Sequence, residues 1–378
     1  MLIEVHMLKN YVPANLNRDD TGSPKSCVFG GVTRGRISSQ CIKRNIRQSE
    51  LFIKECGEFG IRTRKLPQLV ADELKKRGVS EDWIAAAIKK VTGFGNKDGK
   101  ENEDERTAQI MFITPEEVRI AADCIGEVIK ESKDVKAFEK SKAKDIQAMM
   151  SKAGIRPMTL DIALFGRMVT SDAFRDVEAS LQMAHAISTN RLEREFDYYT
   201  AVDDLVSNDV EEDSGAGMIG DMEFNSNCYY MYYNLDLDQL RKNLEGLTNA
   251  EELAKHSAKA FLRAFSYTNP SGKQNSFAAH QLPSAICVEF KDDKIPVSYA
   301  NAFLTPAKPS TGKDLVCDSI EKIISQINNI QECFNDIKVR KRIWFNTVKD
   351  INPPNNVEIV GNMEELLKVF EGVLQEVR

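Results

Sequence analysis

Strand-like segments stand on both sides of a long, highly charged helical stretch in this chain of 378 residues. From Ile3 to Met7, apolar residues alternate with polar Glu4 and His6, which predicts an opening strand with one buried face. From about residue 51 to residue 157 the spacing of apolar residues is helical instead, and the strand pattern returns afterwards. We therefore predict an α+β protein that carries an inserted helical domain.

A second insertion interrupts the strand pattern further along the chain. Residues 195–223 are acidic and rich in glycine, and a loop of this length is usually functional or disordered. We interpret it as a projecting loop. The other predicted elements are a short basic helix after Ser38, a strand and turn at 158–168, alternating residues at 177–187 and 229–237, a helix at 251–265, a strand at 285–290, and helices at 318–330 and 363–377.

Without the two insertions, this order suits an RRM-like (ferredoxin-like) sheet with one helical face. We assign residues 1–50, 158–194 and 224–378 to the sheet domain. The helical insertion is assigned residues 51–157, and the projecting loop residues 195–223.

The composition indicates a globular protein of the cytoplasm. Hydrophobic residues make up 42% of the chain, which is enough for a core, and no apolar run reaches the length of about 18 residues that spans a bilayer. The eight cysteines are scattered, without a CxxC pair or histidines at metal-ligand spacing, as is typical of reduced cytosolic thiols. We predict no membrane segment, no metal site and no cofactor.

The segment from Arg18 to Arg47 is strongly basic, although the whole chain has a net charge of −6. It holds seven basic residues and only two acidic ones, Asp19 and Asp20. One interpretation is a solvated basic surface. The other is a groove in which arginine and lysine neutralise phosphates while neighbouring polar side chains, namely Ser38, Ser39, Gln40 and Asn45, bond backbone oxygens. These residues alone leave both interpretations open.

A second basic pattern lies in the helical insertion. Residues 127–153 contain neither glycine nor proline, so they are predicted to form helix. On that helix, one face would carry Lys130, Lys133, Lys136, Lys140 and Lys144, and the opposite face Val135, Phe138, Ile146 and Met149. The pattern fits either an ordinary amphipathic surface helix or a helix that contacts a polyanion.

The projecting loop contains three further candidate features. Tyr198 and Tyr199 would form either a packing anchor or a platform for stacked bases, and Asp203 and Asp204 are candidate metal ligands without visible partners. Residues 215–220 match the G-x-G-x-x-G pattern, but they follow an acidic run instead of a strand, so a dinucleotide site is excluded. Elsewhere, His185 falls on the apolar phase of its predicted strand and is interpreted as a core histidine.

Several long motifs resemble those of one known family. They are NLNRDDTGSPK with FGGVTRGRISSQCIKRNIR, then ALFGRM, AHAIST, DYYTAVDDL, GKQNSFAA and VSYANAF, in this order along almost the whole chain. They resemble the motifs of the CasC (Cse4) family. Members of this family are the backbone subunits of the type I-E CRISPR Cascade surveillance complex. The region after about residue 305 matches least, and this chain has two tyrosines where the family has tryptophan and phenylalanine.

The resemblance implies a hand-shaped protein with an RRM-like palm, a helical finger domain and a thumb, which forms a filament on CRISPR RNA. The residues implied to bind that RNA are Arg18, Lys25, Ser38, Gln40, Lys43, Arg44, Arg47, Met168, Tyr198, Tyr199 and Lys273. The residues implied to contact target DNA are Lys130, Lys133, Lys136, Lys140 and Lys144. The implied protein partners are further copies of the chain and subunits of the CasA, CasB, CasD and CasE types.

Two alternatives come from other classes of protein. A metal-dependent ribonuclease of the same superfamily would use Asp19, Asp20, Asp203 or Asp204 as catalysts, although no general acid-base pair is visible in the sequence. A scaffold without nucleic acid would instead use the basic segment to bind an acidic protein. The first is tested by RNA cleavage, and the second by the presence of bound RNA.

Overall fold

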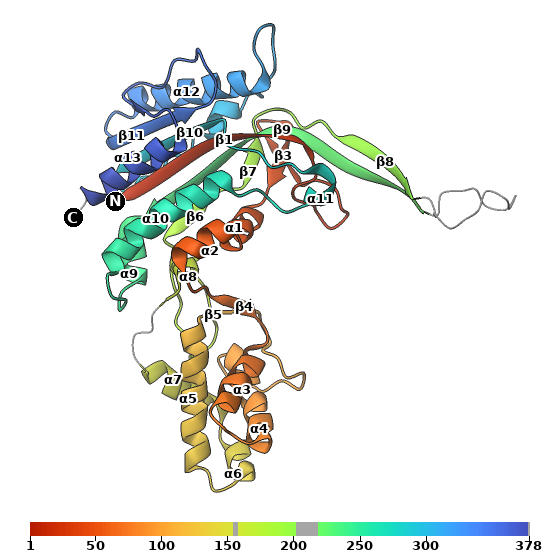
Figure 1. Cartoon of the computed structure of the whole chain (residues 1–378), viewed down its shortest axis with the longest axis vertical. Helices are drawn as coiled ribbons and strands as arrows, with labels where there is room; N and C mark the ends of the chain where they lie inside the picture. Colours follow the sequence, from red (N-terminus) through yellow and green to blue (C-terminus); the bar gives the residue numbers. More distant parts are fainter. Residues whose placement is uncertain (154–157, 202–217, 377–378) are drawn as a thin grey trace, which may run out of the picture. The chain divides into compact units, whose positions relative to one another are not determined.

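The computed structural model describes residues 1–153, 158–201 and 218–376 (Figure 1). They divide into two compact units. The sheet unit comprises Met1–Phe52, Met183–Leu235 and Lys259–Arg378, and the helical unit comprises Ile53–Gln182 and Asp236–Ala258. Residues 158–182 and 236–258, which were predicted to belong to the sheet domain, therefore lie in the helical unit.

A sheet of ten strands forms the frame of the sheet unit. Its hydrogen-bonded order is β12-β11-β10-β1-β9-β7-β3-β2, and β6 and β8 pair with β9 outside this order. The strands are β1 (Leu2–Ala14), β2 (Ser26–Phe29), β3 (Val32–Ile37), β6 (Leu181–Met183), β7 (Ala186–Ser188), β8 (Glu195–Ala201), β9 (Met218–Asp236), β10 (Ala285–Lys291), β11 (Val339–Asn346) and β12 (Glu358–Ile359). The mixed α and β content confirms the predicted class, while the RRM-like topology stays a prediction.

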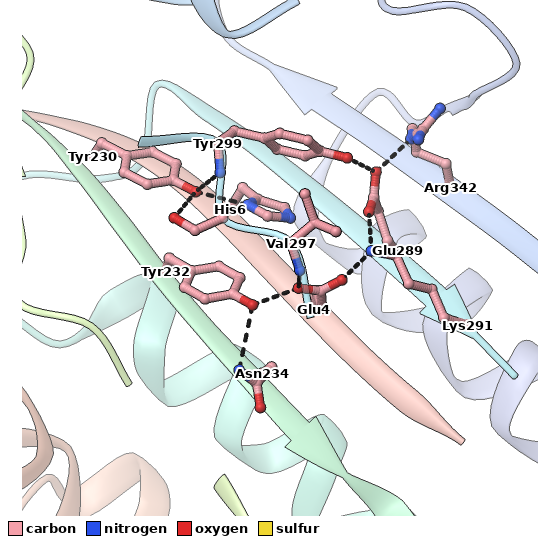
Figure 2. A network of polar contacts seen from close by, with 11 residues as sticks. Glu4, His6, Tyr230, Tyr232, Asn234, Glu289, Lys291, Val297, Tyr299 and Arg342 are labelled. Carbon is pink, nitrogen blue, oxygen red and sulfur yellow. Dashed lines mark hydrogen bonds and ion pairs between the residues drawn. The ribbon is translucent and has the colours of Figure 1, made fainter. Parts of the chain in front are cut away.

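Both faces of the central strands are buried, so the prediction of one buried face is wrong. Ile3, Val5 and Met7 lie on one face of β1, as expected, but Glu4 and His6 on the other face are also buried, with 0% and 1% exposure. The sheet tolerates these polar residues because they belong to a hydrogen-bonded network with charged and aromatic side chains of β9, β10 and β11 (Figure 2).

Helices cover the two faces of the sheet. The Glu4 face packs against α12 (Leu315–Cys333) and the segment around Tyr299 and Phe303, which share one hydrophobic cluster with Cys287 and Trp344. On the opposite face, Phe261 and Phe265 of α10 (Ala250–Tyr267) contact Tyr233, and Phe370 of α13 (Met363–Gln375) contacts Phe290. These three helices confirm the helices predicted at the corresponding positions.

The helical unit has its own hydrophobic core, which includes Leu74, Phe94, Ile125 and Phe138. Its elements are α3 (Leu66–Lys76), α4 (Glu81–Thr92), η1 (Gly93–Gly95), α5 (Pro115–Glu131), α6 (Val135–Lys140), α7 (Ala143–Lys152), α8 (Leu160–Phe165), α9 (Leu237–Asn243) and the two-stranded sheet β4 (Ile61–Thr63) and β5 (Met111–Ile113). Helix α2 (Glu50–Cys56) begins in the sheet unit and ends in the helical unit.

Two local predictions in this unit are wrong. Residues 127–153 form parts of α5, α6 and α7 instead of one helix, because the Ser132 hydroxyl bonds Val128 O at the end of α5 and the Asp134 carboxylate caps the start of α6. Residues 158–168 contain α8 and not a strand, and α8 ends at Gly166 with a φ of 69°.

No helix in the described parts of the chain is long and apolar enough to cross a membrane. All eight cysteines are free thiols.

Candidate nucleic-acid interface

Helix α1 (Ser39–Arg47) positions much of the basic segment. Ser38 caps its first turn by accepting a 3.2 Å hydrogen bond from Cys41 N, and Ile42 and Ile46 are buried on one side. Gln40 and Arg44 are therefore exposed, while Lys43 and Arg47 are half-buried. Ser38 itself is buried, so its cap bond occupies an oxygen that was predicted to meet RNA.

A groove with a volume of about 470 Å³ lies beside α1 in the sheet unit. It is lined by Leu16, Asn17, Arg18, Asp19, Ser38, Gln40, Cys41, Arg44, Asn45, Ser271 and Gly272. Four residues that were predicted to bind RNA, namely Arg18, Ser38, Gln40 and Arg44, thus meet in one concave surface.

Three cations lie in or near this surface, Arg18 and Arg44 in its lining and Lys25 close by. Within the described residues, the side chains of Arg18, Lys25 and Arg44 form no ion pair. By contrast, Lys259, Lys313 and Lys341 of the same unit pair with Glu371, Glu321 and Glu358. Cations without a carboxylate partner keep their charge available for an external anion, and this favours phosphate as the ligand of the groove.

Asp19 shapes the loop beside Arg18. Its Oδ1 atom accepts hydrogen bonds from Thr21 N at 3.0 Å, Thr21 Oγ1 at 2.7 Å and Ser23 N at 3.0 Å. These bonds lower the pKa of Asp19 from its ordinary value, the Thr21 hydroxyl having the largest effect. This carboxylate therefore closes an Asx-type turn that presents Arg18.

Arg34 does not belong to the groove, although it contributes to the basic segment. Its guanidinium is fully buried and donates to the carbonyls of Ser188, Thr189 and Phe303 at 3.1, 2.7 and 2.6 Å. Arg34 thus ties β3 to the end of β7 and to the segment before Leu304. Sequence alone does not separate such an internal arginine from one that binds a ligand.

Lys273 lies on a loop that the groove residues hold in place. Asn45 Oδ1 accepts a 3.1 Å bond from Ser271 N, and Gly272 lies so close to Leu16 O that a Cβ atom would be 2.3 Å from it. Lys273 is exposed and has a φ of 52°, a left-handed conformation that is uncommon for lysine. The loop therefore brings Lys273 beside α1, and its contact with the guide stays a prediction.

Lys9 supports the start of the same loop from inside the sheet unit. Its buried Nζ donates to Ser266 O at 3.0 Å and Thr268 O at 3.1 Å, at the end of α10. Burial lowers the pKa of Lys9 to about 7. A neutral amine has two hydrogens to donate, and both have acceptors here.

We expect this lysine to make stability depend on pH. Between the lowered pKa of the folded state, about 7, and the ordinary value near 10, the unfolded chain binds more protons, so stability rises with pH. Relative to Lys9→Met, the unmodified protein should gain on the order of 1 kcal/mol of unfolding free energy per pH unit above about pH 7. Urea unfolding at several pH values measures this difference, and parallel profiles for the two proteins would contradict it.

Tyr198 and Tyr199 do not form one aromatic platform. They are neighbours on β8, so their side chains point to opposite faces of the β8–β9 ribbon. Tyr199 is 40% exposed and lies over Gly220 on β9, whereas Tyr198 is 65% exposed and shares its face with Phe196. The acidic candidates of the same arm, Asp203 and Asp204, lie outside the described residues.

Met168 projects from the helical unit with 90% of its surface exposed. The preceding residue, Arg167, anchors it: the buried guanidinium donates to both carboxylate oxygens of Glu117 at 2.6 Å and to Phe112 O at 2.9 Å. Glu117 also completes the capping box of α5 with Thr114. An exposed apolar side chain on such a fixed base suits the wedge role that was predicted for Met168.

The five lysines predicted to contact DNA are all exposed, and they form no ion pair within the described residues. They do not share one helix, because Lys130 is in the last turn of α5, Lys133 lies between helices, Lys136 and Lys140 are on α6, and Lys144 is on α7. The apolar residues predicted to lie opposite them include Phe138 and Ile146, which are buried in the core of this unit.

Comparison with known proteins identifies the family. The model of the family described as CT1975-like protein matches residues 3–369. The chain belongs to this family. No curated protein matches it significantly.

Two solved structures resemble this CT1975-like protein over its whole length. A chain of the structure titled "CRISPR RNA-guided surveillance complex, pre-nicking" is 27% identical, with a TM-score of 0.82, and the match covers 99% of this chain and 100% of that chain. A chain of a second structure, titled "CRISPR RNA-guided surveillance complex", is 22% identical, with a TM-score of 0.73 and the same coverage. The second likeness shows the fold alone.

In this CT1975-like protein, the prediction of a core histidine at position 185 is wrong. His185 is exposed, and Ala186 and Ser188 are buried in its place. The strand phase shifts because β6 and β7 are separate short strands, with Ala184 and His185 between them. His185 belongs to an alternating pattern and to the family motif AHAIST. Neither the pattern nor the motif indicates that His185 lies beside the basic segment.

Proposed function

We propose that this CT1975-like protein is a non-catalytic backbone subunit of a type I-E CRISPR Cascade complex. In this function, copies of the chain line up along CRISPR RNA, bind its phosphate backbone and present its bases for pairing with target DNA. The sheet unit is the palm, the helical unit is the finger domain and the β8–β9 ribbon is the thumb.

The groove beside α1 carries this proposal. It gathers Arg18, Gln40, Arg44 and the loop of Lys273 in a protein that is acidic as a whole, and three of its nearby cations have no carboxylate partner within the described residues. The likeness to chains of RNA-guided surveillance complexes supports RNA as the anion. Contacts to phosphate and sugar carry no sequence information, which suits a subunit that accepts any guide.

The buried aromatic residues of the sheet support the same placement. RRM proteins commonly stack bases on aromatic residues of the sheet face, but Tyr230, Tyr232 and Trp344 lie beneath α12 and the Tyr299 segment. Base stacking by these side chains would require that cover to leave. RNA bound along the strand ends and α1 needs no such change.

The five exposed lysines between Lys130 and Lys144 would contact target DNA, since exposed lysines without carboxylate partners among the described residues attract a polyanion. Partners of the CasA, CasB, CasD and CasE types, and further copies of the chain, complete the proposed complex.

Purification from the native host tests the proposal. We expect the protein to carry short RNAs that share CRISPR repeat sequence, seen in a raised absorbance ratio and by sequencing of the extracted RNA. Protein that contains no RNA and binds none at low ionic strength would contradict RNA binding and favour a scaffold that meets an acidic protein.

A cleavage assay separates the proposed role from a ribonuclease. Labelled guide and target RNA incubated with the protein and magnesium should remain intact. Cleavage that Asp20→Ala or Asp204→Ala abolishes would overturn the non-catalytic role.

A further inference from the structure

His185 lies next to the basic segment and is held there by two donors. Its Nδ1 atom is 3.3 Å from Ser39 N, in the first turn of α1, and 3.3 Å from Arg36 Nη1 on β3. No described residue bonds the Nε2 atom, and the side chain is exposed.

These contacts determine the position of the ring proton. A backbone N–H group and a guanidinium can only donate hydrogen bonds, so Nδ1 must accept both. A neutral histidine with an accepting Nδ1 carries its hydrogen on Nε2. The Nε2 atom, which no described residue bonds, is therefore a donor.

Positive charge surrounds the ring on several elements. Partial burial lowers the pKa of His185 from its ordinary value, and Arg36 of β3, Lys25 of the segment before β2 and Lys43 of α1 lower it further. At neutral pH the ring is thus uncharged within a cationic surface, which attracts anions to the position that Nε2–H faces.

We infer that His185 is an uncharged hydrogen-bond donor to a phosphate oxygen of bound nucleic acid, with Nε2–H as the donating group. This inference rests on the proposed function and adds a contact beside Ser39 and Arg36 of the basic segment. It differs in kind from the lysine and arginine contacts, because a neutral donor releases no counterion when it binds phosphate.

The salt dependence of binding distinguishes the two kinds of contact. We expect His185→Ala to weaken the binding of a fluorescein-labelled single-stranded RNA about tenfold at every salt concentration, at a pH near 8, with an unchanged slope of log affinity against log salt. Lys25→Gln, the charged control, should lower that slope by about 0.7. A similar drop in slope for His185→Ala would show a cationic contact and overturn the inference.

Two conservative variants separate phosphate binding from positioning. The glutamine side chain in His185→Gln can place an amide donor near the Nε2 position, whereas His185→Asn retains only an acceptor near Nδ1 for Ser39 N and Arg36. We expect His185→Gln to restore most of the affinity and His185→Asn to restore little. The opposite order would show that the histidine only positions α1 and Arg36.

A single-stranded DNA of the same sequence completes the test. A phosphate contact predicts the same relative loss for DNA in His185→Ala, while a loss confined to RNA would assign the donor to a ribose hydroxyl and overturn the phosphate assignment. Binding of RNA by the unmodified protein tests the proposed function separately, so a failure of the inference and a failure of that function give different results.

Discussion

The triple variant Arg18→Gln, Lys25→Gln and Arg44→Gln should bind single-stranded RNA about 100-fold more weakly than the unmodified protein at about 0.1 M salt. Each neutralised phosphate contributes about 0.7 to the slope of log affinity against log salt, so three lost contacts reduce the slope by about 2. The loss should be the same for unrelated RNA sequences, because these side chains would contact phosphate and not base edges. Fluorescence anisotropy over a range of salt concentrations measures both quantities.

A matched control removes the same amount of charge elsewhere in the sheet unit. Lys259→Gln, Lys313→Gln and Lys341→Gln together also change the net charge by three, but each of these lysines already pairs with a glutamate. We expect little change in RNA binding for this control. An equal loss in both triple variants would mean that overall charge drives binding, and the groove would lose its special role.

The second large effect concerns the buried network on the Glu4 face of the sheet. Lys291→Met should destabilise the protein by about 3–5 kcal/mol, since it leaves buried carboxylates with one cation fewer. Lys291 Nζ contacts Glu4 and lies 3.4 Å from Glu289 Oε2, and Glu289 Oε1 accepts a 2.7 Å bond from Arg342 Nε (Figure 2). Two anions and two cations are thus balanced inside the fold.

The pH dependence of this variant follows from Glu4. Burial raises the pKa of Glu4 from its ordinary value, and Lys291 opposes that rise. Without Lys291 the pKa in the folded state increases further, so the folded state binds a proton more readily than the unfolded state, and the loss of stability should be smaller near pH 5 than near pH 8. Urea unfolding at the two pH values measures this.

The double variant Glu4→Gln with Lys291→Met is the control for the network. It removes one charge of each sign and keeps the Glu289–Arg342 pair, while glutamine can still accept the bonds from Tyr232 Oη and Val297 N. We expect it to be more stable than Lys291→Met alone. A double variant as unstable as the single one would show that packing of the lysine chain, and not charge balance, is responsible.

Sequence patterning predicted helices better than strands in this protein. The N-cap Ser38 with Ile42 and Ile46 determined α1, because cap and periodicity lie within a few residues of each other. Glu4 and His6 were placed on a solvated face, since nothing in β1 itself reveals that Lys291 and Arg342 lie on neighbouring strands. Pairing between distant strands brings these charges together, and local patterns do not contain that information.

The residues of the candidate site also differ in how far local sequence indicates their roles. The charge asymmetry of one short segment left a solvated surface and a phosphate groove open, and the family resemblance implied that Arg18, Gln40 and Arg44 bind RNA. The structure brings these three residues together in one groove. Arg34 and His185 were not separable from other residues by type, because their roles depend on which carbonyls or donors a different strand places beside them. Ser132 and Asp134 show a third case, in which local side-chain bonds end α5 and begin α6 within a segment that periodicity alone would continue as one helix.

The two sides of the β8–β9 ribbon have different chemistry: Phe196 and Tyr198 on one, and Tyr199 against Gly220 on the other. A ribbon inserted between two identical neighbours would therefore touch each of them with a different surface. Where copies of the chain line up as proposed, such a contact joins two different surfaces and is heterologous, and a heterologous contact extends an assembly copy by copy unless its rotation closes a ring.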